Sequence, residues 1–156
     1  LEFCLGNHEE RIMRHVNNHP ELEGSMGYEQ LGLEAMGWTV NGFLKPVVID
    51  GVAYAHYFYN PMSGRPYGGN INNKINKIKG SFTMGHQQGF EMGTETTNTG
   101  RKIWGLVAGS FYLHDEEYKG YQANDHWRGL VMKHDVVDGD YSPCVVNMDY
   151  LLRKYL

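Results

Sequence analysis

The sequence predicts a layered α/β fold in a single domain spanning residues 1–156, and three observations lead to this prediction. The length is ordinary for one domain, and neither a repeat nor a linker-like stretch divides the chain. Twenty glycines and eleven tyrosines favour sheets and ordered loops over long helices. Apolar residues recur at helical spacing in the first part of the chain, whereas strand-like runs dominate from Pro46 onward.

One short strand and two helices are expected before Pro46. Leu1–Leu5 is a short apolar run, typical of a buried strand. A helix is expected over 10–17, where apolar residues recur at helical spacing before Pro20. A second helix is expected over 28–36, with Gly37 ending it in the left-handed conformation.

Three hairpins are expected in the rest of the chain. Asp50-Gly51, the segment "NTGR" and Asp138-Gly139 each separate two strand-like runs, and such turns are typical of antiparallel pairs. The segment "NINNKINKIK" has isoleucines at four- and three-residue spacing, which predicts a short amphipathic helix. The run "SFTMGH" is expected to be a strand that ends at His86, and "DYLLRKYL" a closing helical turn. The polar segment 115–125 is expected to be a loop or an irregular helix.

Composition excludes several classes of protein. The formal net charge is −4 and no basic run is present, so extended binding of a nucleic-acid duplex is not expected. No apolar stretch is long enough to span a membrane. Cys4 and Cys144 are the two cysteines and lie far apart, which is typical of reduced thiols in a cytoplasmic protein.

Histidines follow three of the predicted strands. His8 comes just after the first strand, His56 lies near the end of "VAYAHYF", and His86 ends "SFTMGH". Ligands of layered α/β folds gather where strands run out into loops, and Asn7 and Glu9 stand at the same kind of place. Imidazole nitrogen with amide or carboxylate oxygen suits manganese, iron, zinc or nickel. The pattern therefore predicts a metal site, although each histidine alone is an ordinary surface or core residue.

The order of these groups resembles a known enzyme family. Gly6-Asn7-His8-Glu9 after an apolar strand, then the lone His56, then Gly85-His86 at a strand end, is similar to the last three motif blocks of the calcineurin-like metallophosphoesterases. The segments "AHYFYNP" and "MGHQQGF" look most like a phage-type member. The resemblance implies a four-layer α/β/β/α sandwich and metal-dependent hydrolysis of a phosphomonoester or phosphodiester, possibly of a nucleotide or nucleic acid.

The resemblance also implies roles for individual residues. Asn7, His56 and His86 would bind one divalent cation, most readily Mn²⁺. His8 would be the catalytic acid, and Glu9 would orient that histidine or set its pKa. Arg65, in the loop after His56, is expected either to meet a substrate phosphate or to be an ordinary solvated arginine.

Two departures from the family pattern limit what is implied. The Asp-x-His and Gly-Asp-x-x-Asp blocks are absent, and Gln88 stands where a histidine ligand of the other metal is expected. The family binds two metals, so this chain would hold at most one partial site. We therefore expect a fragment truncated at its N-terminal side, associating with the missing part or with another chain. The alternatives are a non-catalytic remnant of the fold, acting as a binding or assembly module, and a β-rich structural protein with scattered histidines.

Overall fold

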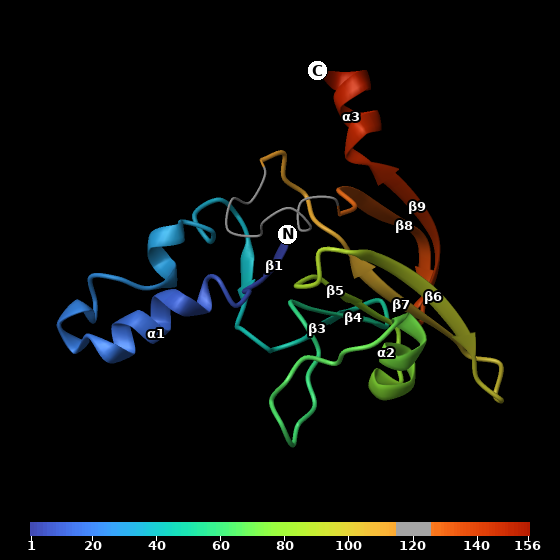
Figure 1. Ribbon diagram of the computed structural model, residues 1–156, viewed down its shortest axis with the longest axis horizontal. Helices are drawn as coiled ribbons and strands as arrows, with labels where there is room; N and C mark the ends of the chain where they lie inside the picture. The colour runs from blue at the N-terminus through green and yellow to red at the C-terminus, as the bar shows by residue number, and fades with distance from the viewer. Residues whose placement is uncertain (115–125) are drawn as a thin grey trace.

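The computed structural model describes residues 1–114 and 126–156, and these residues form a mixed α/β fold with three sheets (Figure 1). In chain order the elements are β1 (Glu2–Cys4), α1 (Glu10–Asn18), the 3-10 helices η1 (Pro20–Leu22) and η2 (Tyr28–Leu31), β2 (Thr39–Asn41), β3 (Val47–Ile49), β4 (Val52–Ala55), α2 (Ile71–Ile78), β5 (Phe82–Met84), β6 (Phe90–Thr96), β7 (Lys102–Ala108), β8 (Gly129–Val137), β9 (Asp140–Asn147) and α3 (Met148–Tyr155). The predicted α/β class is confirmed. The prediction for 115–125 lies outside the described residues.

All three predicted hairpins are present as antiparallel pairs: β3 with β4, β6 with β7, and β8 with β9. The helix predicted over 28–36 is wrong. Only the 3-10 helix η2 forms, because Gly32 adopts φ 65° directly after it and stops helical propagation. Strand β2 was not predicted; it pairs in parallel with β1 and forms a small sheet of two strands.

The largest sheet has five strands in the order β3-β4-β5-β7-β6. Strands β4, β5 and β7 are parallel to one another, while β3 and β6 pair antiparallel at the two edges. The register places Tyr54 beside Thr83 and Thr83 beside Leu106. Partners in register share a face, so these three side chains lie on one face, and Phe82, one residue away, lies on the other.

Helix α2 covers one face of this sheet (Figure 1). The helix lies close to the backbone of β7: a Cβ added to Gly105 would lie 2.8 Å from Ile75 of the helix. Glycine at this strand position therefore lets the helix pack directly on the backbone. The core cluster under the helix consists of Ile75, Phe82, Met84, Ile103 and Val107.

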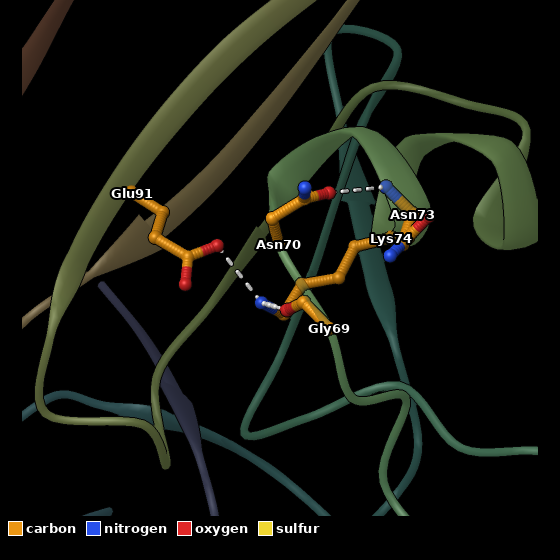
Figure 2. Close-up of polar contacts among 5 residues, drawn as sticks. All are labelled: Gly69, Asn70, Asn73, Lys74 and Glu91. Atoms are coloured by element: carbon orange, nitrogen blue, oxygen red, sulfur yellow. Dashed lines mark hydrogen bonds and ion pairs between the residues drawn. The ribbon is translucent and has the colours of Figure 1, made fainter.

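A fully buried lysine anchors α2 to the sheet, as Figure 2 shows. The Lys74 Nζ donates to the Gly69 carbonyl at 2.5 Å and to Glu91 Oε2 of β6 at 2.9 Å. At the start of the helix, the Asn70 side chain accepts from the backbone N–H of Asn73 at 3.1 Å, an N-cap. The charge of Lys74 is thus matched by a carboxylate and a carbonyl although no water reaches it.

The β8–β9 hairpin lies across the opposite side of the sheet from α2, and its tip contacts the first hairpin. The N–H of Gly139 donates to the Asp50 carbonyl at 2.8 Å, and a Cβ at Gly139 would lie 2.7 Å from the Gly51 carbonyl oxygen. Gly139 has φ 86° and Gly51 has φ 80°, so both turns use the conformation that glycine adopts at little cost. The two Asp-Gly turns therefore set the position of the hairpin on the sheet.

No helix among residues 1–114 and 126–156 combines the length and apolar character needed to cross a membrane. Cys4 and Cys144 are both free thiols.

Candidate metal centre

The ends of β4 and β5 create the site. These strands are adjacent and parallel, with Ala55 paired to Met84, so both chains leave the sheet at the same edge. His56 follows β4 directly and His86 comes two residues after β5. The Gly85 N–H donates to the His56 carbonyl at 3.1 Å, which holds the two exits together. Parallel strand ends are where α/β proteins place their ligands, and here they carry two imidazoles.

The small sheet adds the third group. Asn7 follows β1, and the Cys4 thiol at the end of that strand lies 3.8 Å from the Tyr54 carbonyl of β4. The structure brings Asn7, His56 and His86 together: Asn7 Oδ1 lies 2.7 Å from His56 Nε2 and 3.2 Å from His86 Nδ1. The two ring nitrogens are 3.1 Å apart. Three donor atoms from three separate strand ends thus face one point.

The spacing of these atoms fits a cation. Neighbouring ligands of an octahedral ion with bonds of about 2.1 Å are roughly 3.0 Å apart, and those of a tetrahedral ion roughly 3.4 Å apart. The three observed separations, 2.7, 3.1 and 3.2 Å, lie around the octahedral value. Two nitrogens and an amide oxygen form a donor set suited to Mn²⁺, Fe²⁺, Zn²⁺ or Ni²⁺.

Gly6 and Glu9 build the wall behind this cluster. The Glu9 Oε2 accepts from the Gly6 N–H at 2.7 Å, so the carboxylate closes the turn between β1 and α1. A Cβ at Gly6 would lie 2.9 Å from the His56 ring and 2.9 Å from Glu9 Oε2. Glycine is therefore the residue that lets Glu9 and His56 approach the same backbone position.

Partial desolvation disfavours the charged form of both imidazoles. Desolvation, then the neighbouring His86, lowers the pKa of His56 to about 4, against the opposing effect of Glu9. Desolvation followed by His8 lowers the pKa of His86. Both rings are thus neutral near pH 7. A neutral imidazole has a lone pair with which to bind a cation.

A cleft of about 600 Å³ opens over the cluster. His8 is exposed in its wall, and Gln88 also lines it. No hydrogen bond joins His8 to Glu9 within the described part of the chain, because the Glu9 carboxylate turns to Gly6. Arg65 does not line the cleft; it is exposed in the loop between β4 and α2, where its carbonyl accepts from the Asn60 N–H at 2.9 Å.

Aromatic rings that the sequence reasoning did not single out surround His56. The ring of Tyr57 is 5.7 Å from that of His56 and 4.9 Å from that of His86, and Phe43 packs edge-on against Tyr57 at 5.6 Å. The only local sign in the sequence that Tyr57 belongs to the site was its position next to His56. Phe43 enters from a segment whose strand β2 was not predicted.

The donor set is small. Among residues 1–114 and 126–156, no three His, Cys, Asp or Glu side chains gather at a common point, so the cluster consists of two histidines and one amide. A single cation, completed by water or substrate oxygens, is what this arrangement can hold. The ligands for a second metal, which the family pattern includes, have no counterpart in the cluster.

No protein-family model, curated protein or solved structure matches this chain. Functional inference therefore rests on the geometry of the cluster and on its motif order.

Proposed function

We propose that this chain acts as a metal-dependent phosphoesterase of the calcineurin-like type, with one divalent cation held by Asn7, His56 and His86. The observation that carries the proposal is the convergence of the three donor atoms within 2.7 to 3.2 Å of one another. Mn²⁺ is the first choice, because it accepts both nitrogen and oxygen ligands in an octahedral arrangement. The four-layer sandwich and a cytoplasmic location are parts of the same proposal.

The substrate would be a phosphomonoester or phosphodiester, such as that of a nucleotide or nucleic acid. A divalent cation in this position would polarise a phosphoryl oxygen and lower the pKa of a bound water. Asn7, His56 and His86 would fix the cation at the floor of the cleft. His8, exposed in the cleft wall, would give a proton to the leaving oxygen as a water oxygen bonds to phosphorus and the ester phosphorus–oxygen bond breaks. Glu9 would act indirectly, by holding the turn that carries Asn7 and His8.

A non-catalytic role is the second candidate, and the small donor set favours it. Glu9 is the carboxylate nearest to Asn7 in the sequence, yet it accepts a hydrogen bond from the Gly6 N–H and does not contribute a ligand to the cluster. A bridging carboxylate and the ligands of a second cation would have to come from another segment or chain, which makes association with a partner part of the proposal. Without them, the chain would bind a metal or phosphate ester and not hydrolyse it.

The first test is Mn²⁺ binding followed by electron paramagnetic resonance. We expect one bound ion per chain, with affinity reduced about tenfold or more in His56→Ala, because one of three protein ligands is lost. His134→Ala is the matched control, since His134 is an exposed histidine on β8. Equal affinity in the two variants, or absence of Mn²⁺ binding in a folded sample, would overturn the proposed centre.

The second test is Mn²⁺-dependent hydrolysis of adenosine 5′-monophosphate, whose ribose oxygen needs a proton to leave, followed by release of inorganic phosphate. We expect hydrolysis that is lost in His8→Ala while Mn²⁺ affinity is kept. Bound Mn²⁺ without hydrolysis would instead select the non-catalytic role.

A further inference from the structure

Lys133 of β8 lies on the sheet face that α2 does not cover, and it is held by neutral groups. Its Nζ donates to the Tyr54 hydroxyl at 3.0 Å and to the Thr83 hydroxyl. The same Nζ lies 4.2 Å from the centre of the Tyr54 ring and 4.9 Å from that of Tyr141. An ammonium has three N–H donors, so two are used by these hydroxyls.

No carboxylate within the described residues pairs with this ammonium. Within 1–114 and 126–156, the ion pairs are His19–Glu21, Lys74–Glu91 and Lys102–Asp140, and none includes Lys133. Hydroxyls and ring faces stabilise a cation only partly, and removing it from water without an anion costs free energy. The contrast is Lys74, which is fully buried and has its charge matched by Glu91, whereas Lys133 is half-buried.

A pocket of about 360 Å³ opens at Lys133. Its polar lining is Lys133 with the hydroxyl residues Tyr54, Thr83 and Ser110, and none of the described residues that line it is acidic. Gly109, Ser110 and Phe111 line both this pocket and the cleft over the histidine cluster. The two cavities therefore meet along one short segment after β7.

The two cavities also follow one another along strands β4 and β5. Tyr54 of β4 lines the pocket, and His56, which follows β4 directly, lines the cleft; their backbone positions are roughly 7 Å apart in an extended chain. On the neighbouring strand, Thr83 of β5 lines the pocket and His86, two residues after the strand ends, lines the cleft. A substrate whose phosphoester lies at the cluster can thus place a second group at Lys133.

We infer that the Lys133 pocket binds a second anionic group of the substrate, a phosphate or a carboxylate, next to the cleft that would hold the reacting phosphoester. The substrate class is then a phosphoester with an additional anion, such as a nucleoside bisphosphate. This inference rests on the proposed phosphoesterase function. An anion would supply the missing counter-ion and accept the remaining N–H of Lys133. Burial lowers the pKa of Lys133 to about 8, so the amine remains mostly protonated at pH 7.

Anion binding is tested first without metal. Inorganic phosphate is titrated in the presence of EDTA and followed by ³¹P nuclear magnetic resonance. We expect Lys133→Met to weaken binding about tenfold or more, since a charge-assisted contact is lost. Lys45→Met is the control, because Lys45 is exposed and lines neither cavity. Unchanged binding in Lys133→Met, or absence of phosphate binding by the unaltered protein, would overturn the inference.

A labelling experiment on the unaltered protein covers the case in which Lys133→Met does not fold. Phosphate should slow acetylation of Lys133 by acetic anhydride and leave that of Lys45 unchanged, as read by mass spectrometry. Equal rates at Lys133 with and without phosphate would contradict the inference.

Kinetics with Mn²⁺ then link the pocket to the reaction. We expect Lys133→Met to lower kcat/KM about tenfold or more for adenosine 3′,5′-bisphosphate and to leave it unchanged for adenosine 5′-monophosphate. An equal loss for both nucleotides would refute a subsite for the second anion. If phosphate binds at Lys133 but no ester is hydrolysed, the proposed phosphoesterase function is refuted. The idea that one substrate occupies both cavities is then refuted as well, and only an anion-binding site at Lys133 remains.

Discussion

The Lys74–Glu91 pair allows a sharp test of how α2 is held on the sheet. Lys74 is completely buried, whereas 37% of the Glu91 side chain is exposed. Removing the carboxylate leaves a buried ammonium with one carbonyl at 2.5 Å. Removing the ammonium leaves a carboxylate that water can reach. The two single substitutions should therefore have very different costs, although each breaks the same contact.

Breaking a buried ion pair by removing one partner costs about 3–5 kcal/mol. We expect Glu91→Ala to lie near the lower end, about 3 kcal/mol, because the space it leaves opens to solvent. Lys74→Met keeps the volume of the side chain and removes the charge, and should change the free energy of unfolding by only about 1 kcal/mol. The double variant should match Lys74→Met, which means a coupling of about 3 kcal/mol between the two sites.

Urea denaturation followed by tryptophan fluorescence measures these values. With an m value of about 2 kcal/mol/M, Glu91→Ala should lower the midpoint by about 1.5 M. Glu95→Ala is the matched control on the same strand; Glu95 is exposed, and the change should stay within about 0.5 kcal/mol. If Lys74→Met were as destabilising as Glu91→Ala, or if Glu91→Ala matched the control, the reasoning from buried charge would be refuted.

Three further predictions follow from the site and the turns. Gly6→Ala would place a Cβ 2.9 Å from the His56 ring and should weaken Mn²⁺ binding about tenfold, read by paramagnetic resonance; unaltered affinity would show that the ring can shift freely. The pKa of His56 is lowered to about 4, so the unfolded state takes up its proton first as pH falls, and the neutral ring contributes stability above about pH 6.5 that is lost toward pH 4. Calorimetry should accordingly show a Tm that decreases across this interval, less steeply in His56→Gln; parallel curves would contradict the assignment. Gly139→Ala should lower the free energy of unfolding by about 2–3 kcal/mol, because the added Cβ clashes with a neighbouring backbone and the φ is left-handed. Gly100 also has a left-handed φ, 83°, but no atom lies near its added Cβ, so Gly100→Ala should cost only about 1 kcal/mol. Equal urea midpoints for the two variants would exclude the clash.

The sequence by itself determined the elements whose signals are local. Asp50-Gly51 and Asp138-Gly139 specify tight turns through backbone conformations that few residues adopt, and both hairpins formed where predicted. The isoleucine spacing of 71–78 specified α2. Polar residues after apolar runs marked Asn7, His56 and His86 as strand-end groups before any contact between them was known. Local patterns failed at 28–36, where apolar spacing suggested a helix but Gly32 interrupts it.

Only the tertiary structure decided which of these groups meet. The parallel pairing of β4 with β5 aligns the exits of His56 and His86, and pairing of this kind depends on residues about 30 positions apart that no short window connects. The same holds for Lys133, which looks like any polar residue of an alternating strand until β8 is laid over Tyr54 and Thr83. Whether a charged side chain is solvated or left without a counter-ion depends on which faces pack together, and packing is set by the whole fold.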